Sequence, residues 1–291
     1  MNNHTTVHAQ AHAHALYVVA TPIGNLADMV PRAVEILQAV DLIAAEDTRH
    51  SGKLMQHFDI TTPMVAYHDH SDSARVDSLV ARLVGGESLA LISDAGTPLI
   101  SDPGYRLVKA ARAQSIQVIP IPGACAFVAA LSASGLPSDR FSFEGFPPAK
   151  AVARQKFFES LGQDPRTLIF YESPHRVLES LESMRDAFGA ERNAVLAREI
   201  TKTFETILSA SLEDLVASVR ADSNQQRGEI VLLVQGYSAP DLGDSLAPDT
   251  ERTLTILLEE LPVKQAAALA ARITGEKKNA LYKWALSRSK L

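Results

Sequence analysis

The segment Leu89–Gly104 places the strongest constraint on the fold of this chain. It begins with an apolar run, Leu89–Ile92, which is typical of a buried strand. It continues as a loop that holds glycine or proline at positions 96, 98, 103 and 104, and a short helix is predicted over Tyr105–Ala113. Open α/β sheets bind ligands at the carboxyl ends of their strands, so this loop is a candidate binding site. The alternative is a tight connection whose glycines serve only to form turns.

The same loop lacks the features of a phosphate-binding loop. It contains no Gly-x-x-x-x-Gly-Lys-Ser/Thr motif, and the first basic residue after the strand is Arg106. We therefore expect a small-molecule ligand that accepts an acidic neighbour, either Asp94 or Asp102.

Strands and helices alternate along the first half of the chain. We predict strands at 16–20, 42–45, 64–67, 89–92 and 116–121, with helices near 30–40, 73–84, 105–113 and 124–133. This alternation predicts an α/β fold with a parallel sheet and right-handed crossovers. Polar residues gather where these strands end, at 21–26, 46–50, 68–70, 93–98 and 122–125, which predicts one functional edge.

The second half repeats an α/β pattern before it becomes helical. Strands are predicted at 167–171, 194–197, 204–208 and 229–234, and the alternation within 204–208 favours an antiparallel strand. Segments 135–137 and 145–148 are rich in glycine and proline, as expected of an interdomain hinge. The predicted organisation is a disordered His-rich leader at 1–15, an N-terminal α/β domain at 16–134, a C-terminal α/β domain at 135–240, a linker at 241–250 and a basic helical module at 251–291.

Composition excludes several classes of protein. Cys125 is the single cysteine, which rules out a disulfide framework or a cysteine-based zinc site and favours a reducing cytoplasm. No apolar stretch approaches the ~20 residues that span a bilayer, and the leader lacks the long apolar core of a signal peptide. The leader's histidines at 4, 8, 12 and 14 could bind a metal, but their Ala-, Thr- and Gln-rich surroundings favour disorder.

The charge of the chain is distributed unevenly. The net charge is −6, yet residues 262–291 carry seven Lys or Arg and one acid, which gives +6 there and leaves −12 for the remainder. A helix is predicted over 251–260, followed by two short helices across a turn at Gly275, as in a helix-turn-helix, with Lys277 and Lys278 at the start of the last helix. This module is interpreted as a nucleic-acid contact, and the alternative is a helical cap that buries Trp284.

The motifs resemble the tetrapyrrole-methylase superfamily. Gly-x-Gly-x-x-Gly after the first strand, His-Glu-x-x-His, Gly-x-Ser-x-Gly and Cys-x-x-Cys are all absent, which excludes the common nucleotide, zinc-hydrolase and esterase sites. Gly96-Thr97-Pro98 stands where that superfamily has a Gly-Asp-Pro loop, and Pro122–Cys125 is similar to its Pro-Gly-x-Ser turn. The resemblance implies two α/β domains, S-adenosylmethionine in the cleft between them, and a homodimer.

Six further blocks resemble the ribosomal RNA small subunit methyltransferase I family within that superfamily. They are residues 21–26, 45–49, 93–104, 170–176, 197–202 and 228–233, and the resemblance extends from about 16 to 291. It implies methylation of the ribose 2′-oxygen of a cytidine in the decoding region of 16S rRNA. Two alternatives are a C-methyltransferase for a tetrapyrrole and a noncatalytic regulator that senses S-adenosylmethionine and binds nucleic acid.

This resemblance, together with the glycine-proline loops, assigns residues to the methyl donor. Thr97 replaces the superfamily's aspartate, which leaves Asp94 or Asp102 as the acidic contact. Cys125 is expected to be a packing residue, because methyl transfer needs no covalent intermediate. The expected donor contacts are Gly24, Asp94, Ala95, Gly96, Thr97, Pro98, Ile100, Ser101, Pro122, Gly123, Ala124, Cys125 and Tyr171.

A ribose hydroxyl is a poor nucleophile, so a base or good alignment must assist it. Glu172 and Glu199 are favoured as the base, with Lys202, His175 and Asp47 as further candidates. Each glutamate could instead be a structural ion-pair partner of Arg176 or Arg198. The expected RNA contacts are Arg49, His175, Arg176, Arg198, Lys202, Lys277 and Lys278, and no metal is required.

Overall fold

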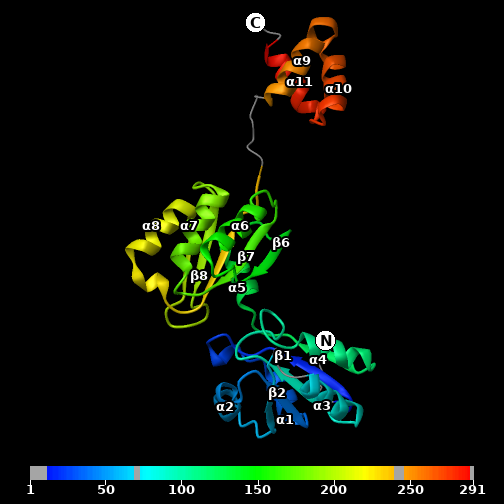
Figure 1. Cartoon of the computed structure of the whole chain (residues 1–291), viewed down its shortest axis with the longest axis vertical. Helices are drawn as coiled ribbons and strands as arrows, with labels where there is room; N and C mark the ends of the chain where they lie inside the picture. Colours follow the sequence, from blue (N-terminus) through cyan, green and yellow to red (C-terminus); the bar gives the residue numbers. More distant parts are fainter. Residues whose placement is uncertain (1–11, 69–72, 239–245, 289–291) are drawn as a thin grey trace, which may run out of the picture. The chain divides into compact units, whose positions relative to one another are not determined.

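The first sheet contains five parallel strands in the order β3-β2-β4-β1-β5. The computed structural model describes residues 12–68, 73–238 and 246–288 (Figure 1). β4 (Leu89–Ile92), which the sequence predicts as a buried strand, lies between β2 and β1 and is buried throughout. The other strands are β1 (Ala15–Val19), β2 (Leu42–Ala45), β3 (Met64–Ala66) and β5 (Gln117–Ile121).

Helices cover both faces of this sheet, as parallel strands require. On one face, α1 (Pro31–Ala39) and α2 (Thr48–His57) enclose a core that includes Tyr17 and Ile43. On the other face, α3 (Ser73–Val84) and α4 (Tyr105–Ala113) pack on residues such as Leu89 and Leu91. A short 3-10 helix, η1 (Leu26–Asp28), follows β1.

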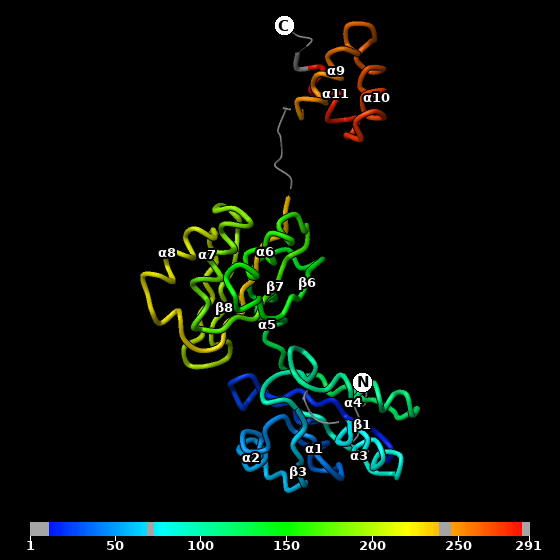
Figure 2. Tube along the Cα trace, in the orientation of Figure 1, coloured from blue at the N-terminus to red at the C-terminus, as the bar shows by residue number. Residues whose placement is uncertain are grey.

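The second sheet is mixed, with the order β6-β7-β10-β8-β9. Only β6 and β7 are parallel, and the pairs formed by β10 with β7, β10 with β8, and β8 with β9 are antiparallel. Figure 2 traces the chain from the first sheet, whose colours begin at blue and cyan, into this green and yellow one. The bounds are β6 (Phe141–Gly145), β7 (Thr167–Glu172), β8 (Asn193–Arg198), β9 (Thr206–Ser211) and β10 (Ile230–Val234).

The two faces of the second sheet are covered by different helices (Figure 1). α6 (Ala151–Leu161), α7 (Val177–Phe188) and α8 (Leu212–Ala221) enclose one core around Phe158 and Phe170, and the 3-10 helix η2 (Ser223–Gln226) follows α8. α5 (Ala126–Ser134) packs on the opposite face through Ala130 and Leu131. α5 lies before the domain boundary expected after residue 134, yet it packs on the second sheet.

The C-terminal residues form a compact unit of their own, which begins at Tyr237. α9 (Pro248–Glu260), α10 (Val263–Thr274) and α11 (Lys278–Arg288) share a core that contains Leu254, Leu281 and the buried Trp284. Gly275 ends α10 in a left-handed conformation and forms the turn before α11. The predicted pair of helices is therefore present, and the helix predicted at 251–260 begins at Pro248, inside the expected linker.

Several sequence expectations need correction. Ala15, assigned to the leader, is the first residue of β1, while residues 1–11 of the leader and 241–245 of the linker lie outside the described residues. α2 and β6 were not expected. The predicted strand 204–208 is shifted to Thr206–Ser211, although its antiparallel pairing is confirmed. In the described part of the chain, no helix is both long and apolar enough to cross a bilayer.

Candidate active site

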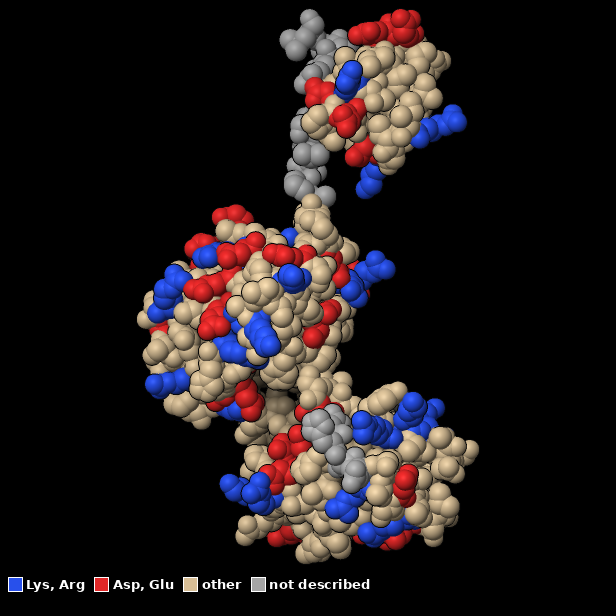
Figure 3. Space-filling view, viewed as in Figure 1, with Lys and Arg blue, Asp and Glu red and all other residues tan. Residues whose placement is uncertain are grey.

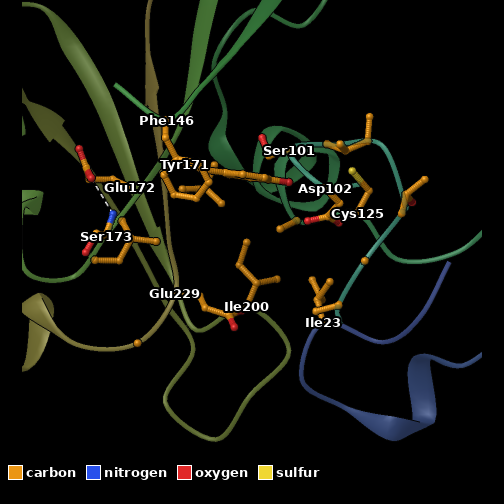
Figure 4. Close-up of a pocket in the computed structure, with 18 of the residues that line it drawn as sticks. Ile23, Ser101, Asp102, Cys125, Phe146, Tyr171, Glu172, Ser173, Ile200 and Glu229 are labelled. Carbon is orange, nitrogen blue, oxygen red and sulfur yellow. Dashed lines mark hydrogen bonds between the residues drawn. The ribbon is translucent and has the colours of Figure 1, made fainter. Parts of the chain in front are cut away.

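A cavity of about 360 Å³ lies between residues of the two α/β domains. The first domain contributes the loop after β4 and the turn before α5, and the second contributes the ends of β7, β8 and β10. Figure 4 shows Asp102, Cys125 and Ile23 from the first domain around the same space as Tyr171, Ile200 and Glu229 from the second. The full lining is Ile23, Ala95, Gly96, Thr97, Ile100, Ser101, Asp102, Cys125, Ala126, Phe146, Tyr171, Glu172, Ser173, Pro174, Ile200, Gly228, Glu229, Ile230 and Val231.

The loop after β4 is held in a fixed shape by backbone hydrogen bonds. Thr21 N donates to Gly96 O at 2.9 Å, and Gly96 N donates to Thr21 O at 3.0 Å. Gly96 has a φ of +82°, and a Cβ placed there would meet Ile23 Cγ2 at 3.4 Å. Thr97 Oγ1 donates to Ala124 O at 3.0 Å, which ties this loop to the turn before α5. The predicted ligand loop is therefore preorganised, and the positive φ of Gly96 favours glycine where the loop approaches the cavity.

Tyr171 forms the centre of the opposite wall. Its hydroxyl accepts a hydrogen bond from Phe127 N at 3.4 Å, and its ring lies 5.7 Å from that of Phe146. Val231 on β10 pairs with Tyr171 on β7, so two segments that are distant in the sequence form one wall of the cavity. Burial raises the pKa of Tyr171, and burial also raises the pKa of the Cys125 thiol. Both groups stay protonated near neutral pH, which agrees with Cys125 as a packing residue.

The structure distinguishes the two acidic candidates near the loop. Asp102 lines the cavity, whereas Asp94 does not. Asp94 Oδ1 instead accepts a hydrogen bond from Asp47 N at 3.1 Å, and its own N–H donates to Glu46 at 3.3 Å. Asp94 thus joins the ends of β2 and β4, and of these two candidates only Asp102 lines the cavity.

Glu172 reaches the cavity lining, but its carboxylate is engaged elsewhere. The side chain is fully buried and pairs with Arg176 at 2.9 Å, and Ser173 N donates to it at 2.6 Å. The Ser180 hydroxyl of α7 donates to its second oxygen. In Figure 4 this side chain points away from Asp102 and Cys125. The ion pair with Arg176, one of the two readings that the sequence allows, is confirmed.

Glu199 and Lys202 form a second cluster beside the cavity. Lys202 Nζ lies 2.8 Å from Glu199 and 3.1 Å from Glu229, and Glu229 N donates to Glu199 at 2.9 Å. Burial acts to raise the pKa of Glu199, but the hydrogen bonds from Lys202 and Glu229 N outweigh it, and the pKa lies below its ordinary value. Burial acts to lower the pKa of Lys202, and its two carboxylate partners outweigh this and raise it. Both groups are therefore charged near neutrality, and Glu199 pairs with Lys202 rather than with Arg198.

The segment that carries this cluster contacts the first domain. Glu199 and Thr201 have φ values of +52° and +67°, which are unusual for residues other than glycine. A Cβ on Gly24 would lie 2.4 Å from Lys202 Cγ, and Thr201 Oγ1 donates to Asp28 at 2.5 Å. Gly24 is thus a place of close approach between the domains. It does not line the main cavity.

A second cavity of about 370 Å³ shares three residues with the first. These shared residues are Ile23, Cys125 and Ile200. Gly123 and Ala124, both expected donor contacts, line only the second cavity, together with Asp28 and Thr201. Of the other expected donor contacts, Ala95, Gly96, Thr97, Ile100, Ser101, Cys125 and Tyr171 line the main cavity, and Gly24, Asp94, Pro98 and Pro122 line neither.

The expected RNA contacts differ in accessibility. Arg49 is 90% exposed and pairs at 2.9 Å with Asp47, which caps α2, and its hydrogen bonds lower the pKa of that carboxyl. His175 is also exposed. Arg198 is buried and donates to Phe204 O at 3.0 Å, and its Nε has no hydrogen-bond partner among the described residues. Lys277 and Lys278 are exposed on the C-terminal unit.

Sequence reasoning missed the part of the lining that comes from 200 and 228–231, together with Phe146. Block 228–233 carried part of the family resemblance. Its Gly228 is a signal that could have been used, because a Cβ at this position would lie 2.4 Å from Glu199, which favours glycine there. Within the described residues, no group of three or more His, Cys, Asp or Glu side chains is arranged to hold a metal ion.

Comparison with known proteins places the chain in a family. The model for tetrapyrrole (corrin/porphyrin) methylases matches residues 15–216. A protein of Pseudomonas aeruginosa named ribosomal RNA small subunit methyltransferase I is 60% identical over 95% of this chain and 98% of its own length. The chain belongs to this family of tetrapyrrole methylases. The protein of the same name from Escherichia coli O157:H7 is 56% identical over 93% of this chain and 94% of its own length.

Family membership makes this protein an S-adenosylmethionine-dependent methyltransferase, as the resemblance implied. Residues 244–289 match the model of the RsmI C-terminal HTH domain, which confirms the helix-turn-helix interpretation. A solved uroporphyrin-III-C-methyltransferase from Thermus thermophilus has a TM-score of 0.53 at 20% identity, covering 76% of this chain and 94% of its own. A cobalt precorrin-4 methyltransferase has a TM-score of 0.57 at 16% identity over 76% and 95%. These structures confirm the predicted fold class.

Proposed function

We propose that this protein methylates the ribose 2′-oxygen of a cytidine in the decoding region of 16S rRNA, with S-adenosylmethionine bound in the main cavity. The observation that carries the rRNA substrate is the 60% identity, over nearly the whole chain, to a protein named for that substrate. The helix-turn-helix match at 244–289 supports a nucleic-acid substrate over a tetrapyrrole.

The cavity fits the chemistry of the donor. The loop at 95–101 brings backbone amides and carbonyls to the wall, where they can hold an adenosine or an amino-acid group without a buried charge. Ile23, Ile200 and Val231 provide an apolar surface for an adenine. Asp102 is a carboxylate within reach of the donor's ammonium or ribose hydroxyls, and we assign it the acidic contact that Thr97 cannot make. When bound, S-adenosylmethionine supplies a methyl group activated by a sulfonium.

The charged residues beside the cavity are proposed to hold the second domain's side of the cavity in place, so that the substrate is positioned correctly. Glu172 accepts three hydrogen bonds or ion-pair contacts, and Glu199 and Lys202 neutralise each other, so none of them is a free base. Alignment of a hydroxyl with a methyl donor can contribute roughly 7–11 kcal/mol to lowering a barrier in favourable systems. We propose that alignment by the rigid loop and by the 199–202 segment carries most of the acceleration.

RNA phosphates are proposed to contact exposed cations on both units. Arg49 follows β2 at the functional edge, and Lys277 and Lys278 begin α11. Arginine suits bidentate phosphate contacts and lysine suits point contacts. We also expect the protein to be cytoplasmic and to form a homodimer. Analytical ultracentrifugation of the purified protein measures the oligomeric state.

The experiment that tests this proposal is transfer of labelled methyl to 30S subunits, free 16S rRNA and uroporphyrinogen in parallel. Nuclease digestion followed by mass spectrometry then places the label on a ribose or on a base. The proposal predicts label on the ribose of a cytidine. Label on a base, or transfer to uroporphyrinogen alone, would overturn it.

A further inference from the structure

One exposed helix face adjoins the candidate active site and has no role in the chemistry described so far. α4 begins at Tyr105, three residues after Asp102 of the cavity wall. Its inner residues Leu107 and Ala111 are fully buried in the core of the first domain. Its outer face therefore points to solvent from an element that is fixed to the donor loop.

The outer face of α4 combines an aromatic ring with three cations. Tyr105 is 64% exposed, and Arg106, Lys109 and Arg112 are all exposed. Tyr105, Lys109 and Arg112 are spaced at i, i+4 and i+7, so they share one stripe of the helix. Lys109 Nζ lies 5.7 Å from the centre of the Tyr105 ring, within cation–π distance. Figure 3 shows blue side chains gathered over the position that α4 has in Figure 1.

The charge of this region contrasts with that of the rest of the chain. Residues 1–261 carry a net charge of −12, yet no acidic residue stands between Asp102 and Asp139. Arg106, Lys109 and Arg112 form no ion pair with any acidic residue that the structure describes. The cations of α4 are thus available to an external polyanion.

We propose that the Tyr105–Arg112 face of α4 binds a single-stranded segment of the RNA substrate next to the target nucleotide. The cations contact phosphates, and the Tyr105 ring stacks on a base, which is how proteins bind unpaired RNA. The inference rests on the proposed rRNA substrate. It adds a contact surface in the first domain, separate from the C-terminal helices.

Two substitutions and their controls test this surface. The triple variant Arg106→Gln/Lys109→Gln/Arg112→Gln removes the three cations, and Arg32→Gln/Arg140→Gln/Lys156→Gln removes the same charge from exposed positions on other parts of the body. Tyr105→Ala removes the ring, and Tyr105→Phe keeps it. The full-length proteins are titrated against a 16S rRNA transcript and against 30S subunits at several salt concentrations. Calorimetry with S-adenosylmethionine monitors the donor site.

The α4 triple variant should bind the transcript more weakly and lower the slope of log affinity against log salt by about 2, at roughly 0.7 for each phosphate contact. Tyr105→Ala should weaken binding by roughly 5- to 150-fold, and Tyr105→Phe should bind as wild type. The dispersed triple variant should keep the wild-type slope, and donor affinity should stay unchanged throughout.

Other outcomes separate this inference from the proposed function. If wild type methylates rRNA and the α4 variants bind the transcript as wild type does, the inference fails and the proposed function stands. If the variants lose affinity for 30S subunits but keep it for the transcript, the partner of α4 is a protein and the inference is overturned. If wild type methylates no rRNA, the proposed function fails, and the inference fails with it.

Discussion

Substitution of Gly96 by valine should weaken donor binding while leaving the fold intact. Gly96 has a φ of +82°, and a Cβ there would already touch Ile23 Cγ2 at 3.4 Å. The positive φ costs a β-branched residue about 1–2 kcal/mol of folding stability. The two γ-methyl groups crowd a loop held by the Thr21 backbone pair, and overpacking costs about 1–3 kcal/mol. If the overpacking cost of about 1–3 kcal/mol arises when the donor binds, the dissociation constant of the donor rises roughly 5- to 150-fold.

The matched control is Gly135→Val, which carries a similar backbone cost outside the cavity. Gly135 has a φ of +73°, and a Cβ there would have no atom within 4 Å. Both variants should lose stability by thermal denaturation, Gly96→Val at least as much as Gly135→Val, and only Gly96→Val should lose affinity for S-adenosylmethionine by calorimetry. Equal donor affinity in the two variants would refute the placement of the donor against this loop.

Three further predictions concern the charged groups and the C-terminal unit. Glu172→Gln leaves Arg176 without its buried partner and should cost about 3 kcal/mol of stability in denaturant titrations, with donor affinity retained. The pKa of Glu199 lies below its ordinary value of 4.5 in the folded protein, so its stabilising effect is present above pH 4.5 and is lost as the pH falls through the folded pKa. The stability difference between wild type and Glu199→Gln, followed by denaturation across pH 3–7, should therefore shrink below about pH 4.5, and a constant difference would contradict the ion pair. Removal of residues 237–291 should weaken rRNA binding but spare donor binding, because that unit has its own core, and an equal loss of both would make it a structural cap.

The elements that the sequence revealed are those with a strong hydrophobic pattern. β2 and β4 are found at their predicted bounds, as are α3 and α4, because each has a continuous apolar run or an apolar helical stripe. α2 was missed because few of its residues are apolar and Gly52 interrupts it, although Asp47 was a readable capping signal. β6 was missed because its short sequence lies between glycine and proline residues that favour a loop.

The candidate site was predictable where the local backbone conformation restricts the residue type, and at Tyr171, which the family resemblance identified. Gly96 and Pro98 identified the loop at 95–101, which forms one wall of the cavity. The opposite wall depends on β10 inserting between β7 and β8, which brings Val231 beside Tyr171, and no local signal encodes such a register. Tyr171 and Glu172 both border the cavity, but their side chains point to opposite faces of the sheet, so the Tyr171 ring faces the cavity and the Glu172 carboxylate is buried against α7.

The most direct measurement is a crystal structure of the protein with S-adenosylmethionine bound. The account predicts the donor in the cavity between the two α/β domains, with its polar groups on the backbone of residues 95–101 and on Asp102, and with Tyr171 on the opposite side. A donor bound anywhere else on the chain would contradict it.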